Sequence, residues 1–248
     1  MRQLAYILAL TPFLVGCGSH TVRVVDMTPP RQAELAPTEA QLLDVGISIF
    51  DANVPEDYDE RIEQIIMPEV RRAESQYIPY FLKTTLQSTG NWGAVRVVPR
   101  PTAAVDLIVS GKILYSDGES MGVEAIVSDA SGRVWFAKEY TAFASKYAYG
   151  SDIPPSIDAF QSIYKRLADD MLTYREQLSD AEIYRIRNVA ELKFAQGFSK
   201  EAFRDHVEQD SNGIYQITRL PADEDPMLIR VRQIREREYL FIDTLDEH

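Results

Sequence analysis

The sequence has few of the residues that form covalent cross-links or metal centres. Its 248 residues include one cysteine and three histidines. A single cysteine excludes a disulfide framework within the chain and a cysteine-rich zinc or iron–sulfur site. The histidines are His20, His206 and His248, and none of them belongs to an HExxH or HxH pattern. We therefore expect no metal and no other cofactor, and we interpret His206 as a helix-surface residue.

Basic charge and phosphate-binding glycine loops are also scarce. The chain has 26 basic and 38 acidic residues, which give a formal net charge of -12. A surface of this sign disfavours the phosphate backbone of nucleic acids as a partner. Neither GxxxxGK[ST] nor GxGxxG occurs in the sequence. We therefore expect no nucleic-acid partner, and we interpret the protein as not being an enzyme.

The first seventeen residues have the order of a bacterial export signal. Arg2 supplies a positive charge, and residues 4–15 form a mostly apolar run. A run of this length is too short for a membrane-spanning helix, which takes about 20 residues. The cysteine follows at once, and the residues around it are Leu14, Val15, Gly16 and Cys17. The alternatives are an ordinary signal peptide whose cleavage site contains a cysteine and a buried N-terminal helix.

The segment that ends at Cys17 resembles the lipobox of bacterial lipoproteins. The resemblance implies that residues 1–16 are removed as a signal peptide and that the Cys17 thiol carries a lipid. Each buried acyl methylene contributes about 0.8 kcal/mol, so two or three chains would hold the protein in a membrane. No Asp follows the cysteine, which resembles lipoproteins of the outer membrane that face the periplasm; the inner membrane is the alternative.

The mature chain divides into three predicted regions. Residues 17–41 contain three prolines and no sustained period, which is typical of an extended tether. Residues 42–150 have strand-like patterns around one helix, and residues 151–248 are mainly helical in pattern. An apolar content of 45% is enough for a globular core in a chain of this length.

Alternating apolar residues predict five strands in the central region. The predicted strands are residues 43–50, 94–98, 106–115, 122–128 and 133–143. The last three are joined by short Asp- and Gly-containing turns, so we expect an antiparallel meander. A helix should end at Gly90 and start near Pro79, or at Pro68 with a kink. Gly111 lies inside a strand, which indicates a bulge or a close approach.

The period changes from two to 3.6 after residue 157. Residues 157–178 predict a helix of about six turns. Residues 179–182 form a capping box for a second helix, and Asp225 with Pro226 begins a last one. That last helix carries five apolar residues, namely Leu228, Val231, Ile234, Leu240 and Phe241. Its arginines predict a salt-bridged solvent face, with an anionic docking surface as the alternative, and they are Arg230, Arg232, Arg235 and Arg237.

These patterns predict an α+β protein. We expect a small α/β sandwich with a mixed or antiparallel sheet and one packed helix, followed by a mainly helical C-terminal region. The Val-Ser-Gly-Lys-Ile core of residues 109–113 resembles the sandwich domain of the lipoprotein activators of penicillin-binding proteins, of curli-secretion lipoproteins and of the TolB amino-terminal domain. Residues 90–99 resemble a group of proteobacterial lipoproteins, which implies a location and no activity.

Aromatic and acidic residues are the remaining candidates for a site. Four aromatic residues could form a surface for a partner or a ligand, namely Trp92, Tyr140, Tyr147 and Tyr149. The acidic residues of 51–60 are interpreted as a solvated loop, with a calcium-binding loop as the alternative. We expect a non-enzymatic adaptor or assembly factor of the cell envelope that binds a protein partner or further copies of itself. The alternatives are a module that binds a small ligand or a lipid, and a hydrolase with paired carboxylates.

Overall fold

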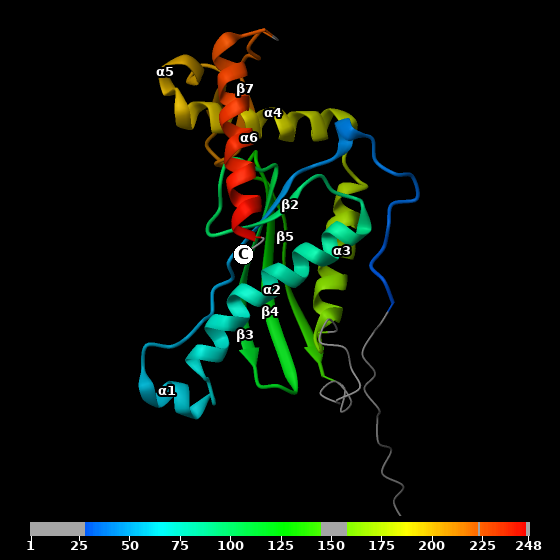
Figure 1. Ribbon diagram of the computed structural model, residues 1–248, viewed down its shortest axis with the longest axis vertical. Helices are drawn as coiled ribbons and strands as arrows, with labels where there is room; N and C mark the ends of the chain where they lie inside the picture. The colour runs from blue at the N-terminus through cyan, green and yellow to red at the C-terminus, as the bar shows by residue number, and fades with distance from the viewer. Residues whose placement is uncertain (1–27, 145–157, 223, 247–248) are drawn as a thin grey trace, which may run out of the picture.

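The computed structural model describes residues 28–144, 158–222 and 224–246 (Figure 1). Its fold is α+β, as predicted: a five-stranded mixed sheet is followed by a mainly helical region. Within the described residues, no helix combines the length and the apolar character needed to span a membrane.

The sheet has the strand order β2-β1-β3-β4-β5. Its strands are β1 (Val45–Ser48), β2 (Val95–Val98), β3 (Leu107–Ser116), β4 (Ser120–Asp129) and β5 (Val134–Phe143). β1 runs parallel to β2 and β3, whereas β3, β4 and β5 form the predicted antiparallel meander. Gly118 and Gly132 have positive φ angles of 85° and 91° in the two turns of the meander, a conformation that glycine adopts without steric penalty.

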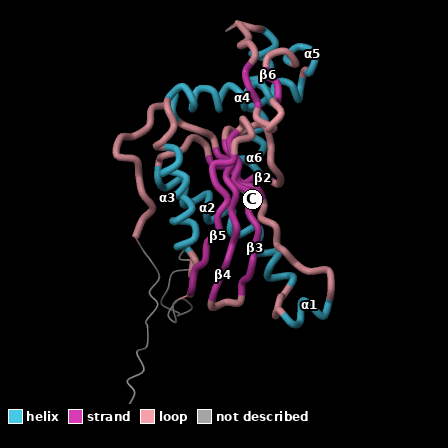
Figure 2. The backbone as a smooth tube through the Cα atoms, turned by 180° about the vertical axis from the view of Figure 1, so that it is seen from behind, coloured by secondary structure: helices cyan, strands magenta, loops and turns pink. Residues whose placement is uncertain are grey.

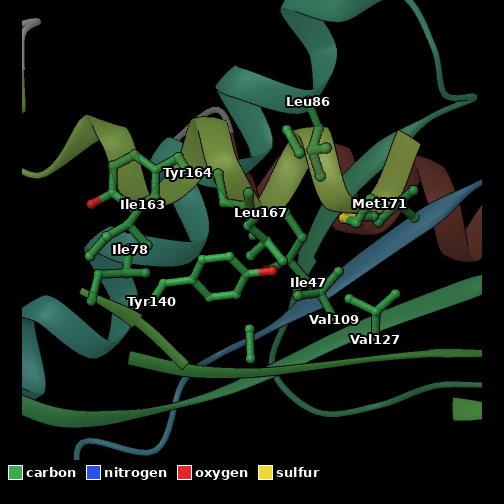
Figure 3. Packing of buried hydrophobic residues seen from close by; sticks show 14 of the residues in the cluster. Ile47, Ile78, Leu86, Val109, Val127, Tyr140, Ile163, Tyr164, Leu167 and Met171 are labelled. Atoms are coloured by element: carbon green, nitrogen blue, oxygen red, sulfur yellow. The ribbon is translucent and has the colours of Figure 1, made fainter. Parts of the chain in front are cut away.

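Two helices cover one face of the sheet, and they are α2 (Pro68–Thr89) and α3 (Gln161–Arg175). α2 starts at Pro68, the earlier of the two predicted starts, and it keeps Pro79 inside the helix. The main core lies between these helices and the sheet. Figure 3 shows Ile47, Val109 and Val127 of the sheet below Leu86, Leu167 and Met171 of the helices. The predicted helical extension, residues 151–248, includes α3. In the structure α3 packs beside α2 on the sheet and so belongs to the main core.

α3 is shorter than the predicted six turns. It has 15 residues and ends at Arg175. The chain must then turn, because the predicted capping box at Ser179 begins α4 (Asp180–Phe198). The Ser179 hydroxyl accepts from the backbone N–H of Glu182, whose carboxylate accepts from the Ser179 N–H at 3.0 Å. This local signal is therefore confirmed, and it sets the end of the preceding helix.

A second, smaller core forms around α4. Its further elements are α5 (Lys200–Phe203), β6 (Val207–Gln209), β7 (Tyr215–Ile217) and α6 (Pro226–Asp246). β6 and β7 pair as a separate antiparallel hairpin. α6 begins with the predicted cap, since Asp225 accepts from the N–H groups of Met227 and Leu228.

Only the first half of α6 packs against α4. Leu228 and Val231 are buried there, but Leu240 and Phe241 are each 65% exposed. The second half of α6 runs past α4 toward β2 (Figure 1). The apolar period of a helix shows which residues share a face, but a neighbour must be present to bury that face.

The last part of the predicted tether is docked on the body, and we call residues 28–42 the strap. The guanidinium of Arg31 reaches Thr173 of α3 and Glu176, which directly follows this helix. Asn91 accepts from the N–H of Ala33 at 2.9 Å and donates to the carbonyl of Arg31 at 3.0 Å. The strap contains the 3₁₀ turn η1 (Glu39–Gln41) and leads into β1. Residues 28–42 are therefore part of the folded domain, whereas the sequence predicted a free linker up to residue 41.

The other face of the sheet is largely open. Figure 2 shows β3, β4 and β5 from this side without a helix in front of them. Tyr115, Ile126, Val134 and Phe143 are exposed large side chains of these strands. Among residues 28–144, 158–222 and 224–246, helices therefore cover the meander on one face only.

Candidate functional site

The predicted site residues fall into two groups. Leu14, Val15, Gly16, Cys17, Tyr147 and Tyr149 lie outside the described residues. Trp92 and Tyr140 are described, and they are only 5% and 1% exposed. The structure therefore corrects the expectation for Trp92 and Tyr140: these two side chains belong to the core and form no surface for a partner or ligand.

Trp92 and Tyr140 are buried because both point toward α3. The ring of Trp92 lies 6.4 Å from that of Trp135, which stacks on Tyr174 of α3 at 4.7 Å. The Tyr140 hydroxyl donates to Asp170 of α3 at 2.7 Å. Burial raises the pKa of Tyr140 above its ordinary value. The alternation of β5 shows which residues share a face of the sheet with Tyr140. It does not show which of the two faces α3 covers.

One GxSxG pattern occurs at residues 118–122, and the sequence analysis passed over it. In serine hydrolases this pattern forms a strained strand-to-helix turn that exposes the serine. Here it forms the strand-to-strand turn between β3 and β4. The Ser120 hydroxyl donates to Asp117 at 3.0 Å, and Asp117 also accepts from the backbone N–H groups of Glu119 and Ser120. The pattern therefore serves turn formation.

His206 is buried rather than exposed on a helix. It follows α5, and its ring Nδ1 lies 2.7 Å from the carbonyl oxygen of Arg219. The Phe203 ring lies 5.7 Å away. His206 therefore ties the chain after α5 to the segment that follows β7, and the interpretation as a helix-surface residue is corrected.

A polar cavity of about 500 Å³ lies between α4, α6 and the segments that lead into β1 and β3. We call it the α4–α6 cavity. Its charged and aromatic lining includes Asp44, Asp106, Tyr184, Arg187, Arg235 and Tyr239. These residues come from four separate parts of the sequence. No sequence pattern joins them, so the sequence analysis did not single them out as a group.

Asp106 is a buried carboxyl group of this cavity, and burial shifts its pKa. It is 3% exposed, and its Oδ2 accepts from the backbone N–H of Asp44 at 2.9 Å. Its Oδ1 lies 3.6 Å from Nη2 of Arg235, beyond hydrogen-bond distance. Burial raises the pKa of Asp106 to about 6, and the positive charge of Arg235 opposes this rise. Asp106 is therefore a buried acid that accepts a backbone hydrogen bond through Oδ2 and faces Arg235 through Oδ1.

α6 is held over the cavity by arginines that bind other segments. Arg235 Nε donates to the carbonyl of Ala104 at 2.8 Å, and the Tyr239 hydroxyl donates to the same oxygen. Arg232 forms a bidentate pair with Glu191 of α4 at 2.6 and 2.9 Å. The predicted salt-bridged solvent face is confirmed for Arg232, which is ion-paired and about half exposed, and it is corrected for Arg235, whose side chain is only 15% exposed.

The cavity contains the kind of acid pair that a carboxylate-dependent hydrolase needs. Asp44 and Asp106 both line it. However, Asp44 Oδ1 accepts from the backbone N–H of Ala94 at 2.8 Å, just as Asp106 accepts from Asp44. Both carboxylates thus tie together the starts of neighbouring strands. A cluster of three or more metal-ligating side chains is not found among residues 28–144, 158–222 and 224–246.

The second notable surface is the segment between β1 and α2, which we call the hook (residues 51–67). It projects from the body and contains α1 (Tyr58–Glu63) (Figure 1). Four large apolar side chains are exposed on it, namely Tyr58, Ile62, Ile65 and Met67. The hook also carries six acidic residues and one arginine, a net charge of -5. Exposed apolar groups with a charged rim are typical of a docking surface.

Ile65 occupies a strained position at the end of α1. Its φ angle is 54°, in the left-handed region that β-branched residues avoid. The N–H of Ile66 binds the carbonyl of Arg61 at 2.8 Å, and the N–H of Ile65 binds that of Ile62 at 3.1 Å. This is a Schellman motif, in which the left-handed position is usually glycine. Ile65 is nevertheless 76% exposed, so its side chain is not explained by packing within the chain.

Comparisons with known proteins identify no family. No family model matches the sequence, and no curated protein matches it. A solved structure of a PelC dodecamer from Paraburkholderia phytofirmans covers 59% of this chain and 98% of its own, with 18% identity and a TM-score of 0.32. A leucine-to-methionine variant of PelC from the same organism covers 58% and 95%, with 19% identity and the same TM-score. A likeness at this level assigns neither fold nor function to this chain.

Proposed function

We propose that the protein is a lipid-anchored lipoprotein of the cell envelope that faces the periplasm and acts as a non-enzymatic adaptor for a protein partner. The anchor is Cys17, after removal of residues 1–16. The outer membrane is its favoured location, because no Asp follows the cysteine.

The hook carries the adaptor role in this proposal. Tyr58, Ile62, Ile65 and Met67 expose apolar surface that no residue of the described chain covers. Asp57, Asp59 and Glu60 surround it with negative charge, and Asp57 caps α1 by accepting from the N–H groups of the other two. The partner that fits is a protein with an apolar groove rimmed by Lys and Arg, because opposite charges guide the encounter and apolar contact supplies affinity.

The strap limits how far the body can lie from the membrane. Its first residue, Thr28, contacts Lys165 of α3. Ten residues separate Cys17 from Thr28, and even a fully extended chain of this length spans only about 35 Å. A lipid on Cys17 would therefore keep α3 close to the bilayer surface, and the partner would meet the hook near the membrane.

Site-specific photo-crosslinking in living cells tests the adaptor role. A photoreactive amino acid at Ile62 should give one discrete protein adduct, whereas the same group at Thr84, exposed on α2, should not. Replacing Asp59, Glu60 and Glu63 by their amides should weaken the adduct at position 62 and reduce its sensitivity to salt, because the screened charges are gone. No adduct at position 62, or equal adducts at both positions, would contradict the proposal.

Mass spectrometry of the native protein tests the anchor. We expect a mature chain that starts at Cys17 and carries a diacylglyceryl thioether, and a Cys17→Ser variant that remains unmodified with its leader. An unmodified cysteine in the wild-type protein from membranes would contradict the anchor, whatever the crosslinking shows.

A further inference from the structure

We propose that the α4–α6 cavity binds one sugar residue of a neutral glycan. The inference depends on the geometry of the cavity alone, and it holds whether or not the adaptor role of the hook is correct. The volume of the α4–α6 cavity, about 500 Å³, lies within the range of small-molecule sites.

The floor of the cavity offers a buried hydrogen-bond acceptor. Asp106 is 97% buried, and only its Oδ2 is engaged by a backbone N–H. Its Oδ1 forms an ion pair with Nη2 of Arg235 at 3.6 Å and accepts no hydrogen bond from the described residues. Oδ1 can therefore still accept a hydrogen bond from a ligand hydroxyl.

Two guanidinium groups offer donors on either side of that acceptor. Arg187 of α4 uses Nη1 for the carbonyls of Glu39 and Ala40. Arg235 of α6 uses Nε for the carbonyl of Ala104. Both arginines line the cavity with Asp106, and Nη2 of Arg235 lies 3.6 Å from Oδ1 of Asp106. A carboxylate beside guanidinium N–H groups can bind two neighbouring hydroxyls, because each hydroxyl both donates and accepts.

Tyr184 supplies the apolar contact that sugars require. Its side chain lines the cavity and is 59% exposed at its edge. The C–H face of a sugar ring can pack on an aromatic ring, while its hydroxyls point to the polar floor. Asp106 and Tyr184 therefore bring a hydrogen-bond acceptor and an aromatic ring to the same cavity.

The charges of the cavity favour a neutral ligand. Its lining contains four carboxylates, of Asp44, Asp106, Glu191 and Glu236, and three guanidinium groups, of Arg187, Arg232 and Arg235. With opposite charges nearly balanced, neither an anion nor a cation gains a large Coulombic advantage. A molecule with many hydroxyls uses both kinds of group without leaving a charge unpaired.

Saturation-transfer NMR on the full-length lipoprotein tests this proposal. The protein is held in a zwitterionic detergent without a sugar headgroup. The neutral probes are glucose, galactose, N-acetylglucosamine and maltotriose, and the charged probes are glucose 6-phosphate and glutamate. We expect transfer to at least one neutral probe, followed by a dissociation constant from calorimetry. No transfer to any neutral probe at millimolar concentration, or tighter binding of a charged probe, would overturn the assignment.

Two variants separate the cavity from the rest of the surface. Tyr184→Ala should weaken binding of the neutral probe by at least about tenfold, because stacking on an aromatic ring is lost. Tyr58→Ala, a matched exposed tyrosine on the hook, should leave it unchanged. Both side chains are exposed, so the fold should remain intact in both. Equal binding by the wild type and Tyr184→Ala would place the sugar elsewhere and refute the proposal.

Discussion

Phe50, which lies two residues past the end of β1, packs directly on Gly111 of β3. A Cβ atom on Gly111 would lie 2.3 Å from Cε2 of the Phe50 ring, well inside van der Waals contact. The N–H of Asp51 also binds the carbonyl of Gly111 at 2.8 Å, which keeps the two segments in place. The glycine predicted to mark a bulge or a close approach therefore marks a close approach.

Gly111→Ala should lower the free energy of unfolding by roughly 1–3 kcal/mol, because an overpacked core must shift. Gly197→Ala is the matched control: it lies in α4, and a Cβ there would meet nothing within 4 Å. This second change should raise stability by about 0.5–1 kcal/mol, as alanine does in a helix. Urea denaturation measures both. Equal stability of Gly111→Ala and the wild type would contradict the close contact.

Ile65→Gly should make the protein more stable. Glycine adopts the left-handed conformation of residue 65 without the roughly 1–2 kcal/mol that an L side chain loses there. The exposed Ile65 side chain gives little burial in return. Thermal melting should show a higher midpoint for Ile65→Gly and a lower one for Ile62→Gly, which places glycine inside α1. A lower midpoint for Ile65→Gly would show that Ile65 serves the fold rather than a partner.

Asp106 should make stability fall as the pH rises. Burial raises its pKa from 3.8 to about 6, so the folded state holds this proton more tightly than the unfolded state does. The resulting stabilisation is complete below about pH 4 and is lost as the pH rises through about 6. Relative to Asp106→Asn, the wild type should lose roughly 3 kcal/mol between pH 4 and pH 7. Denaturant titrations at several pH values measure this difference, and parallel curves for the two proteins would contradict it.

Asn91 should control how firmly the strap is held. Asn91→Ala removes two hydrogen bonds, to Arg31 and Ala33, each contributing about 0.5–1.5 kcal/mol. Hydrogen exchange of the Ala33 amide should accelerate by about 5- to 100-fold. Thr84→Ala, on the exposed face of α2, is the control and should leave that amide unchanged. An unaltered exchange rate in Asn91→Ala would mean that the Arg31 contacts to α3 are sufficient.

Features determined by neighbouring residues were predictable from the sequence. The capping box at Ser179, the cap at Asp225 and the turn glycines at 118 and 132 depend on the backbone within a few positions. The period-two segments likewise predicted β3 to β5 and their antiparallel order, because short turns leave few ways to pair adjacent strands. Short-range sequence patterns were thus sufficient to predict most of the helices and strands.

The candidate sites required the tertiary structure. Asp44, Asp106, Arg187 and Arg235 meet only because α4 and α6 cross beside the starts of β1 and β3. The alternation of β5 shows which residues share a face with Tyr140, but it does not show that α3 covers this face.

The amino-acid sequence alone determined the class of fold, the caps and turns, and the acidic charge of the chain, since each of these depends on composition or on contacts between near neighbours. The tertiary structure decided which apolar faces are buried, that the strap is docked, and that an acid and two arginines surround one cavity. These outcomes depend on contacts between residues 50 to 150 positions apart, roughly the separations seen here, and no local pattern encodes them.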